Sequence, residues 1–281
     1  MLSRQEGLSL VDDEPRFAAD LYRGTAGYYD RYRLPYPEVM ITDLVRRAEV
    51  SEHGRLLDLA CGTGQLTFPL RRWFCEEWAV DSEPDMVEVV RAKAAAGGAG
   101  DVRPIVSSAE SLGAEPDYFE LAVIGNAFHR LDRALVAGRI LGWLKPGGYL
   151  ALCWSSGPSA GEEDWQRALA ATLDRGKVAL GAEGRVPAGW DLPRRCQPDL
   201  QLLAGAGFEV AGRREFSVEH RWSLPELAGY VRSTSFLPAA VLGDQAAAFD
   251  ADLAARLGRM ATAGAFTQTV SFVYDLACKP A

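Results

Sequence analysis

A glycine-containing loop after a buried strand is the strongest chemical signal in the sequence. The run LLDLACGTGQLT occupies residues 56–67. Its first residues belong to a short buried strand that is predicted at 55–60. Gly62 and Gly64 permit a tight turn because they carry no Cβ. A helix that follows such a turn directs its N-terminus and bare backbone N–H groups at a polar ligand group. The loop is therefore a predicted ligand-binding element.

An acidic residue at the end of the next strand supports a nucleoside ligand. Asp81 closes a predicted strand at 76–81, seventeen residues after Gly64. A carboxylate at this place can accept hydrogen bonds from both ribose hydroxyls. The dinucleotide fingerprint needs a third glycine where Thr67 stands. A nucleoside site is thus favoured, and a nicotinamide-dependent oxidoreductase is kept as an alternative.

The elements that position these residues alternate between strands and helices. The predicted strands are 55–60, 76–81, 102–108, 118–125 and 147–154, and the predicted helices are 39–48, 65–73, 84–96 and 133–143. Repeated strand–helix–strand units form a mostly parallel sheet with right-handed crossovers. Ligands of such sheets bind at the carboxyl ends of the strands, where the glycine loop and Asp81 lie.

The rest of the chain is less regular. It predicts helices at 162–176, 199–207, 225–233 and 243–260, and strands at 208–222 and 269–278. We interpret residues 1–281 as a single domain built from four parts. These are an N-terminal helical lid at 1–50, a cofactor-binding core at 51–155, an inserted substrate cap at 156–200, and the C-terminal part of the core with further helical cap elements at 201–281.

Composition restricts the partners. Thirty basic and 38 acidic side chains give a net charge of −8, which disfavours nucleic acid because phosphate binding needs clustered positive charge. Five scattered cysteines and three distant histidines show neither CxxC nor HExxH spacing, so no metal site is expected. The acidic N-terminal residues and the lack of a long apolar run favour a cytoplasmic protein without a membrane span. Formation of a homo-oligomer is left open.

At these motifs the chain resembles the class I S-adenosylmethionine-dependent methyltransferases, through most of its length. LDLACGTG (57–64) looks like their first motif, Asp81 like the ribose acid, and SSAESL (107–112) like the adenine-binding segment. YFELAVIGNAFHRLD (118–132) and LGWLKPGGYLAL (141–152) are similar to their later motifs. The resemblance implies a doubly wound, seven-stranded α/β sheet, mostly parallel, with a reversed last strand.

The resemblance also implies which residues bind S-adenosylmethionine. Its methionine part would lie against Asp58, Ala60, Gly62, Gly64 and Gln65, with Asn126 near the methyl donor. Asp81 would hold the ribose, with Ser82 and Met86 beside it, and Ser108, Ala109 and Glu110 would line the adenine. Many relatives have an aspartate where Ser108 stands. A hydroxyl can still accept a hydrogen bond from the adenine amino group.

The N-terminal run YYDRYRLPYP (28–37) is similar to a signature of a small-molecule branch that includes natural-product N- and O-methyltransferases. In that branch this region covers the cofactor, which implies a lid containing Tyr28, Tyr29 and Arg33. The arginine would pair with the carboxylate of the cofactor. Leu34 stands where proline is usual.

Methyl transfer needs alignment of nucleophile, methyl and sulfur, and a hydroxyl acceptor also needs a base. His129 is the candidate base, or else it only shapes the pocket. Phe128 packs on cofactor or substrate, or else on the core, and Tyr28 is the third catalytic candidate. We expect methylation of an amine on a small natural-product or antibiotic intermediate, releasing S-adenosylhomocysteine. O-methylation of a hydroxyl or carboxyl metabolite is the alternative, followed by the oxidoreductase and a non-catalytic cofactor-binding module.

Overall fold

A seven-stranded sheet forms the centre of the computed structural model, which describes residues 17, 20–51 and 53–281. The strands are β1 (Gly54–Leu59), β2 (Phe74–Asp81), β3 (Val102–Val106), β4 (Phe119–Gly125), β5 (Leu144–Ser155), β6 (Glu209–Trp222) and β7 (Phe266–Cys278). Their order is β3-β2-β1-β4-β5-β7-β6. The five strands β1 to β5 are parallel, whereas β7 runs antiparallel to both β5 and β6. The predicted fold, with its reversed last strand, is confirmed.

Helices cover both faces of the parallel strands, as the alternation of buried residues requires. On one face, α2 (Glu38–Arg47) packs Met40 and Leu44 against Leu56 of β1, and α4 (Pro84–Ala96) lies on the same side. On the other face, α5 (Arg133–Trp143) and α8 (Asp199–Gly205) pack against Leu57 and other residues of β1, β4 and β5. The sheet is therefore buried on both sides, and only its edges and strand ends offer room for a ligand.

Some predicted boundaries differ from the structure. The helix expected at 65–73 is the short α3 (Thr67–Leu70), continued by the 3-10 turn η1 (Arg71–Trp73). Pro69 lies within α3 but has no backbone N–H to donate, so one hydrogen bond of the helical ladder is missing there. The helix expected at 243–260 is η4 (Gly243–Gln245), α11 (Ala246–Leu257) and η5 (Gly258–Met260).

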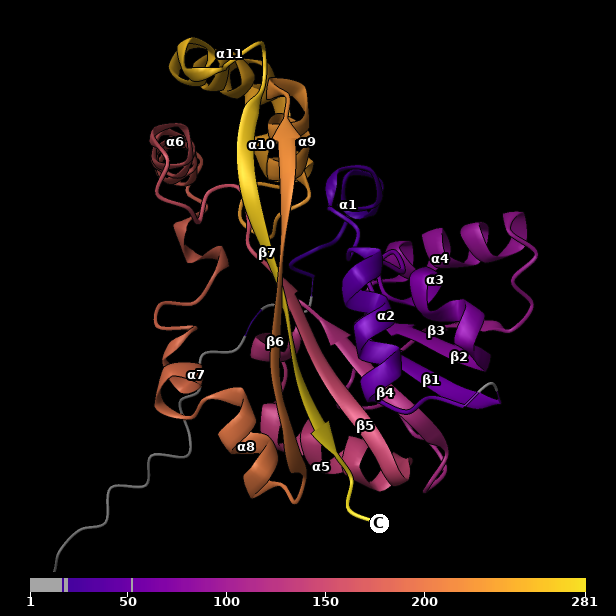
Figure 1. The fold of residues 1–281 in the computed structure, drawn as a ribbon. Coiled ribbons are helices and arrows are strands. Elements are labelled where there is room, and N and C mark those ends of the chain that lie inside the picture. Colours follow the sequence, from indigo (N-terminus) through magenta and orange to yellow (C-terminus); the bar gives the residue numbers. More distant parts are fainter. Residues whose placement is uncertain (1–16, 18–19, 52) are drawn as a thin grey trace, which may run out of the picture.

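A helical cap forms around the extended ends of β6 and β7 (Figure 1). The last pair between β5 and β7 is Ser155 with Phe272, so in the described chain the strands beyond it pair only with each other. Around this two-stranded ribbon lie α6 (Asp164–Ala179), α9 (Leu224–Arg232), α10 (Ala239–Leu242) and α11. These helices share a core with Trp222 and Phe266 of the ribbon. The cap thus draws on residues well beyond 156–200, where the sequence places its main insertion.

The remaining helices connect the cap to the sheet. They are α1 (Ala26–Tyr32), which contacts α9 and α4, the turns η2 (Phe128–Arg130) and η3 (Glu183–Arg185), and α7 (Leu192–Cys196). None of the helices in the described residues is long and apolar enough to cross a membrane. The described residues also contain no cluster of three or more His, Cys, Asp or Glu side chains that could hold a metal.

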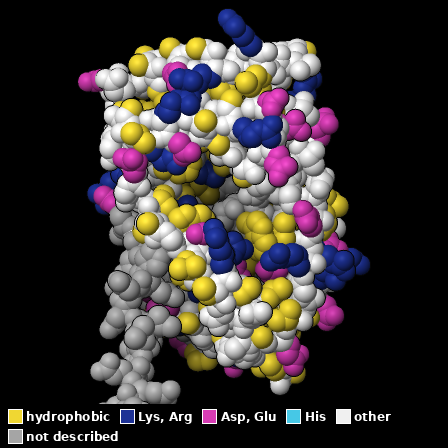
Figure 2. Space-filling view, turned by 90° about the vertical axis from the view of Figure 1, so that its left-hand side faces the viewer, with side chains coloured by type: hydrophobic (Ala, Val, Ile, Leu, Met, Phe, Trp, Pro, Cys, Tyr) yellow, Lys and Arg dark blue, Asp and Glu magenta, His cyan; other side chains and the backbone are white. Residues whose placement is uncertain are grey.

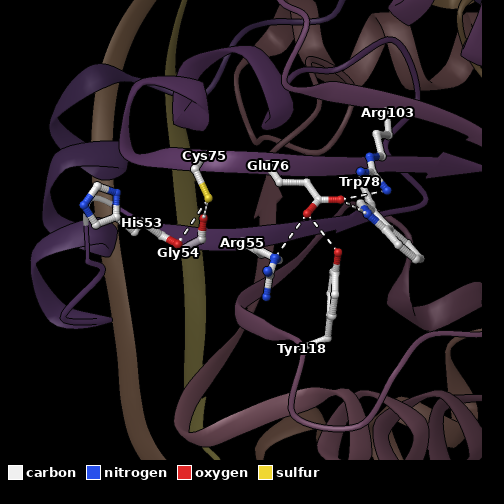
Figure 3. A network of polar contacts seen from close by, with 8 residues as sticks. All are labelled: His53, Gly54, Arg55, Cys75, Glu76, Trp78, Arg103 and Tyr118. Carbon is white, nitrogen blue, oxygen red and sulfur yellow. Dashed lines mark hydrogen bonds and ion pairs between the residues drawn. The ribbon is translucent and has the colours of Figure 1, made fainter.

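A polar network consolidates the sheet near the start of β2, away from the carboxyl ends of the strands (Figure 3). Glu76 accepts hydrogen bonds from Trp78 Nε1 at 2.9 Å and Tyr118 Oη at 2.9 Å, and ion pairs reach it from Arg55 and Arg103. Burial raises the pKa of Glu76, but these hydrogen bonds and charges outweigh it and hold the pKa below its usual range. The network is structural and leaves the opposite edge of the sheet for chemistry.

Candidate active site

The glycine loop and Asp81 form one unit at the carboxyl ends of β1 and β2. The backbone N–H of Gly62 donates to Asp81 Oδ2 at 2.8 Å, and that of Glu83 donates to Oδ1 at 2.9 Å. Burial raises the pKa of Asp81, although these backbone donors oppose the rise. The two bonds fix the orientation of the carboxylate, whose second lone pairs remain available to a ligand.

A cavity of about 300 Å³ opens beside this unit, at the lower end of the size range of ligand pockets. The loop, the end of β2, the segment after β3 and the segment after β4 form its walls, and residues of the N-terminal segment cover it. It brings together these predicted cofactor-binding residues: Ala60, Gly62, Asp81, Ser82, Met86, Ser108, Glu110 and Asn126. Eight of the residues expected at the cofactor therefore meet in one place.

A smaller compartment adjoins this cavity and shares Tyr29, Ala60 and Asn126 with it. Asp58 and Gln65, both predicted at the methionine part, line the smaller compartment. Among the described residues, Asp58 Oδ1 and Gln65 Oε1 are buried without a hydrogen-bond partner. Thr67 Oγ1 donates to the other oxygen of Asp58 at 2.6 Å, and burial raises the pKa of Asp58 to about 7. Two buried acceptors without partners in the lining of one compartment favour a ligand that carries hydrogen-bond donors.

Arg33 lines the same compartment with its positive charge. Its guanidinium donates to Ser233 Oγ at 2.9 Å and Ser233 O at 3.1 Å, and it lies 4.9 Å from the centre of the Tyr29 ring and 4.6 Å from that of Tyr230. All these partners are uncharged. In the described part of the chain, no carboxylate lies within ion-pair distance of Arg33. An anionic ligand group can supply the missing countercharge.

Two non-glycine residues adopt left-handed backbone conformations at the junction of the compartments. Ala60 has φ of 57° and Asn126 has φ of 51°. Asn126 donates from Nδ2 to Tyr36 Oη at 3.2 Å and accepts at Oδ1 from the backbone N–H of Ser155 at 3.2 Å. Such strained residues concentrate at functional sites. The junction is where the reacting groups would meet.

Several predicted residues lie elsewhere. Tyr28 stacks on Tyr32, with ring centres 6.2 Å apart, and does not line either compartment, whereas its neighbour Tyr29 lines both. Ala109 and Phe128 are buried in the core between the sheet and α5. Gly64, with φ of 86°, allows the loop to turn against the ring of Phe68. These residues support the walls of the two compartments without lining them.

His129, the predicted base, faces two neighbouring cavities on the side of α7. Its Nε2 accepts a hydrogen bond from Arg130 Nε at 3.2 Å, and its ring packs 5.1 Å from that of Trp190. Burial, assisted by the charges of Arg130 and Arg194, lowers the pKa of His129 to about 3. The lone pair that a base needs is thus engaged by a cation, and the assignment of His129 as a base stays a prediction.

The site also contains two residues that the sequence did not single out, Arg130 in the main cavity and Tyr230 of the cap in the smaller compartment. Tyr22, which belongs to a tyrosine cluster that the sequence interprets as helix packing or as an aromatic wall, lines the main cavity. Trp222, interpreted from the sequence as core or as a substrate contact, lines the smaller compartment. Arg130 follows the fourth predicted strand by a few residues, which is a signal for a residue at the ligand edge. Tyr230 carries no local signal, because only the packing of α9 brings it to the sheet.

Comparison with known proteins assigns the core to a recognised domain. Residues 56–148 match the family model described as a methyltransferase domain. Uncharacterized methyltransferases of Mycobacterium bovis and Mycobacterium tuberculosis are 30% identical over 135 residues, which is 48% of this chain and 52% of theirs. The chain therefore spans about half the length of the curated relatives it matches.

Several solved structures have a similar fold over most of the chain. A Bacillus halodurans protein assigned as a methyltransferase has a TM-score of 0.54 at 17% identity, covering 86% of this chain and 99% of its own. The YcgJ protein of Bacillus subtilis has a TM-score of 0.54 at 15% identity, covering 87% and 100%. The [4+2]-cyclase SpnF has a TM-score of 0.50 at 19% identity, covering 89% and 84%. At these identities the likeness shows the class I methyltransferase fold, on which more than one chemistry occurs.

Proposed function

We propose that this protein transfers a methyl group from S-adenosylmethionine to a small-molecule acceptor, and that the acceptor atom is an amine nitrogen. One observation carries the proposal. Two compartments that share lining residues extend from the carboxylate of Asp81 to the guanidinium of Arg33 and to Asp58 Oδ1. In the described chain this guanidinium has no ion-pair partner and Asp58 Oδ1 has no hydrogen-bond partner. Asp81 offers a carboxylate for a ribose at one end. At the other end, Arg33 offers a positive charge for a carboxylate and Asp58 offers an acceptor for an ammonium group.

The polar side chains that line the compartments match the polar groups of this cofactor one by one. Asp81 would accept from the ribose hydroxyls, and Ser108 would face the adenine with a hydroxyl that already accepts from the backbone N–H of Ser111 at 3.2 Å. Arg33 would hold the α-carboxylate. Asp58 Oδ1 and Gln65 Oε1 would accept from the α-ammonium, which relieves the cost of two buried unpaired acceptors.

The cofactor would supply an electrophilic methyl group on its sulfonium. The chain has to align the acceptor with that methyl and exclude water, and such alignment can contribute roughly 7–11 kcal/mol. Tyr29 and Asn126 stand at the junction of the compartments, where the methyl would be presented. Burial raises the pKa of Tyr29 to about 12, so its hydroxyl stays neutral there.

The polar groups around the junction favour an amine over a hydroxyl. Asn126, Tyr36 and Ser155 are neutral hydrogen-bonding groups that can orient an amine, and a neutral amine attacks without a base. The nearby imidazole of His129 has its lone pair engaged by Arg130. A hydroxyl acceptor would have to obtain its base from another group.

Calorimetric titration with S-adenosylmethionine, S-adenosylhomocysteine and NAD tests the cofactor. Micromolar binding of the first two alone supports the proposal, and binding of NAD alone contradicts it. Transfer of a labelled methyl group to paired amine and hydroxyl compounds of the same skeleton then tests the acceptor atom. Turnover confined to the hydroxyl member of each pair would establish the O-methyl alternative.

A further inference from the structure

A second guanidinium lies at the other end of the main cavity. Arg130 donates from Nε to His129, and its guanidinium lies 4.5 Å from the centre of the Tyr22 ring and 5.6 Å from that of Phe17. Among the described residues, no carboxylate lies within ion-pair distance of it. The charge of Arg130 is therefore balanced only by rings and by a neutral imidazole.

Two tyrosines separate this arginine from Arg33. The rings of Tyr22 and Tyr29 meet edge to face with centres 6.2 Å apart. Arg33 packs on Tyr29, and Arg130 packs on Tyr22. The two guanidiniums thus belong to different ends of the ligand space, one in the smaller compartment and one beside the main cavity.

The cofactor has an anionic group for only one of the two guanidiniums. S-adenosylmethionine has a single carboxylate, which the proposed function assigns to Arg33. Its adenosine part has no anionic group to offer Arg130. A cation beside a ligand cavity with no acidic partner in the described chain implies a second ligand that carries a negative charge.

Arg130 also lines a neighbouring cavity of about 460 Å³, which lies on the side of α6 and η3. On the face that carries α6 and α7, Figure 2 shows a hollow beneath the upper helices, bordered by hydrophobic and basic side chains. The neighbouring cavity has aromatic walls in Phe17, Trp190 and Phe236. The other charges on its lining are Lys177, which is paired with Asp174, and Glu183. Aromatic walls around one unpaired cation suit a flat ring bearing an acid.

We infer that the second ligand is an aromatic carboxylic acid, bound with its carboxylate on Arg130 and its ring against Trp190 and Phe236. This inference rests on the proposed function, whose cofactor leaves Arg130 without an anionic group. The two cavities share Phe17 and Arg130, so this ligand would border the cofactor space. Arg130 then selects the ligand by charge.

The test compares acids with their uncharged amides. Benzoate, phenylacetate and indole-3-acetate, and the three corresponding amides, are titrated calorimetrically into protein saturated with S-adenosylhomocysteine. For the wild type, at least one acid should bind about tenfold or more tightly than its amide, as expected for a hydrogen bond between charged groups. In Arg130→Gln that preference should disappear in protein that is again saturated with S-adenosylhomocysteine, whose affinity for the variant is measured in the same way.

Two further variants make the result specific. Arg130→Lys keeps the positive charge and should retain part of the preference for acids. Arg194→Gln is the matched control, because the Arg194 side chain lies nearby but is already paired with Asp199 at 2.6 Å. Asp199 keeps a second partner in Arg133 at 3.0 Å, so this control leaves no buried carboxylate unpaired. It should bind acids as the wild type does.

The outcomes separate the inference from the proposed function. If S-adenosylhomocysteine binds but no acid is preferred to its amide, or Arg130→Gln keeps the preference, the inference is wrong and the proposed function stands. If Arg130→Gln loses S-adenosylhomocysteine while Arg194→Gln keeps it, Arg130 serves the cofactor and the inference is again wrong. If S-adenosylhomocysteine binds to no form of the protein, the proposed function fails and the inference falls with it.

Discussion

The backbone N–H of Gly62 and the carboxylate of Asp81 are joined by a hydrogen bond of 2.8 Å. This bond connects the glycine loop after β1 to the end of β2. The acid that is proposed to bind the ribose is thus positioned by the same loop that would approach the methionine part. Any change at Asp81 consequently affects both parts of the proposed cofactor site.

Replacement of Asp81 should weaken cofactor binding more than removal of a surface charge would. Asp81→Ala deletes the proposed ribose acceptor and leaves the Gly62 N–H without its partner. We expect a loss of roughly 1.5–3 kcal/mol in the binding free energy of S-adenosylhomocysteine, the range for a hydrogen bond to a charged group. Calorimetry on Asp81→Ala and on the exposed Asp164→Ala measures it. Equal affinities in the two variants would refute the ribose assignment.

The affinity for S-adenosylhomocysteine should fall as the pH drops below 7. Burial raises the pKa of Asp58 to about 7, so acidification protonates the proposed acceptor for the α-ammonium. The ligand's amine stays protonated between about pH 5.5 and 7.5, because the carboxylate on the same carbon raises its pKa above the range of about 7.7–8.0 found for a peptide N-terminus. The affinity should therefore decrease by up to about tenfold per pH unit within this window.

Asp58→Asn provides the control for that pH dependence. The amide oxygen of asparagine can still accept from Thr67, but it carries no titrating charge. Its affinity for S-adenosylhomocysteine should be lower than that of the wild type at pH 7.5 and nearly constant down to pH 5.5. A pH profile that is identical in both proteins would assign the titration to another group.

Replacement of Glu77 should stabilise the protein at neutral pH. Glu77 is fully buried in β2, and neither of its carboxyl oxygens has a partner among the described residues. Burial, with smaller contributions from Asp101 and Asp58, raises its pKa to about 9. Below pH 4.5 the residue is protonated in both states, and between pH 4.5 and 9 only the unfolded chain ionises. Its contribution to stability is therefore lost as the pH rises through this range.

Glu77→Gln removes this loss while keeping a neutral side chain of similar size. We expect the free energy of unfolding to rise by about 4 kcal/mol at pH 7.5, and to change little at pH 4.5. Urea unfolding at the two pH values measures the difference. The same change at both values would mean that Glu77 does not titrate in this way.

Replacement of His129 should have a small effect on turnover once an acceptor is known. A general base contributes about 10²–10⁴-fold to the rate, but His129 has a pKa of about 3 and its Nε2 accepts from Arg130. His129→Gln keeps an acceptor for Arg130 and should lower kcat by less than about tenfold. A loss of about 100-fold or more with unchanged cofactor affinity would instead establish His129 as the base.

The parallel core, and the meeting of most predicted site residues around one cavity, could be predicted from the sequence because their signals are local. A strand, a glycine turn and an acid at the next strand end are read from short segments, and Gly62 and Asp81 indeed meet. The choice between Tyr28 and Tyr29 depends on how α1 is rotated, which packing against α9 and α4 decides. Tyr230 reaches the site from α9 by tertiary packing alone.

The two-stranded ribbon beyond the end of β5 carries the cap away from the parallel sheet. The buried residues of the cap form a cluster of their own, and in the described chain they share no member with the clusters on the sheet. Substitutions on α6, α9 and α11 can therefore change the cap side of the two compartments while the glycine loop and the parallel strands keep their packing. Such an arrangement would let the proposed cofactor-binding core combine with caps that suit different small molecules.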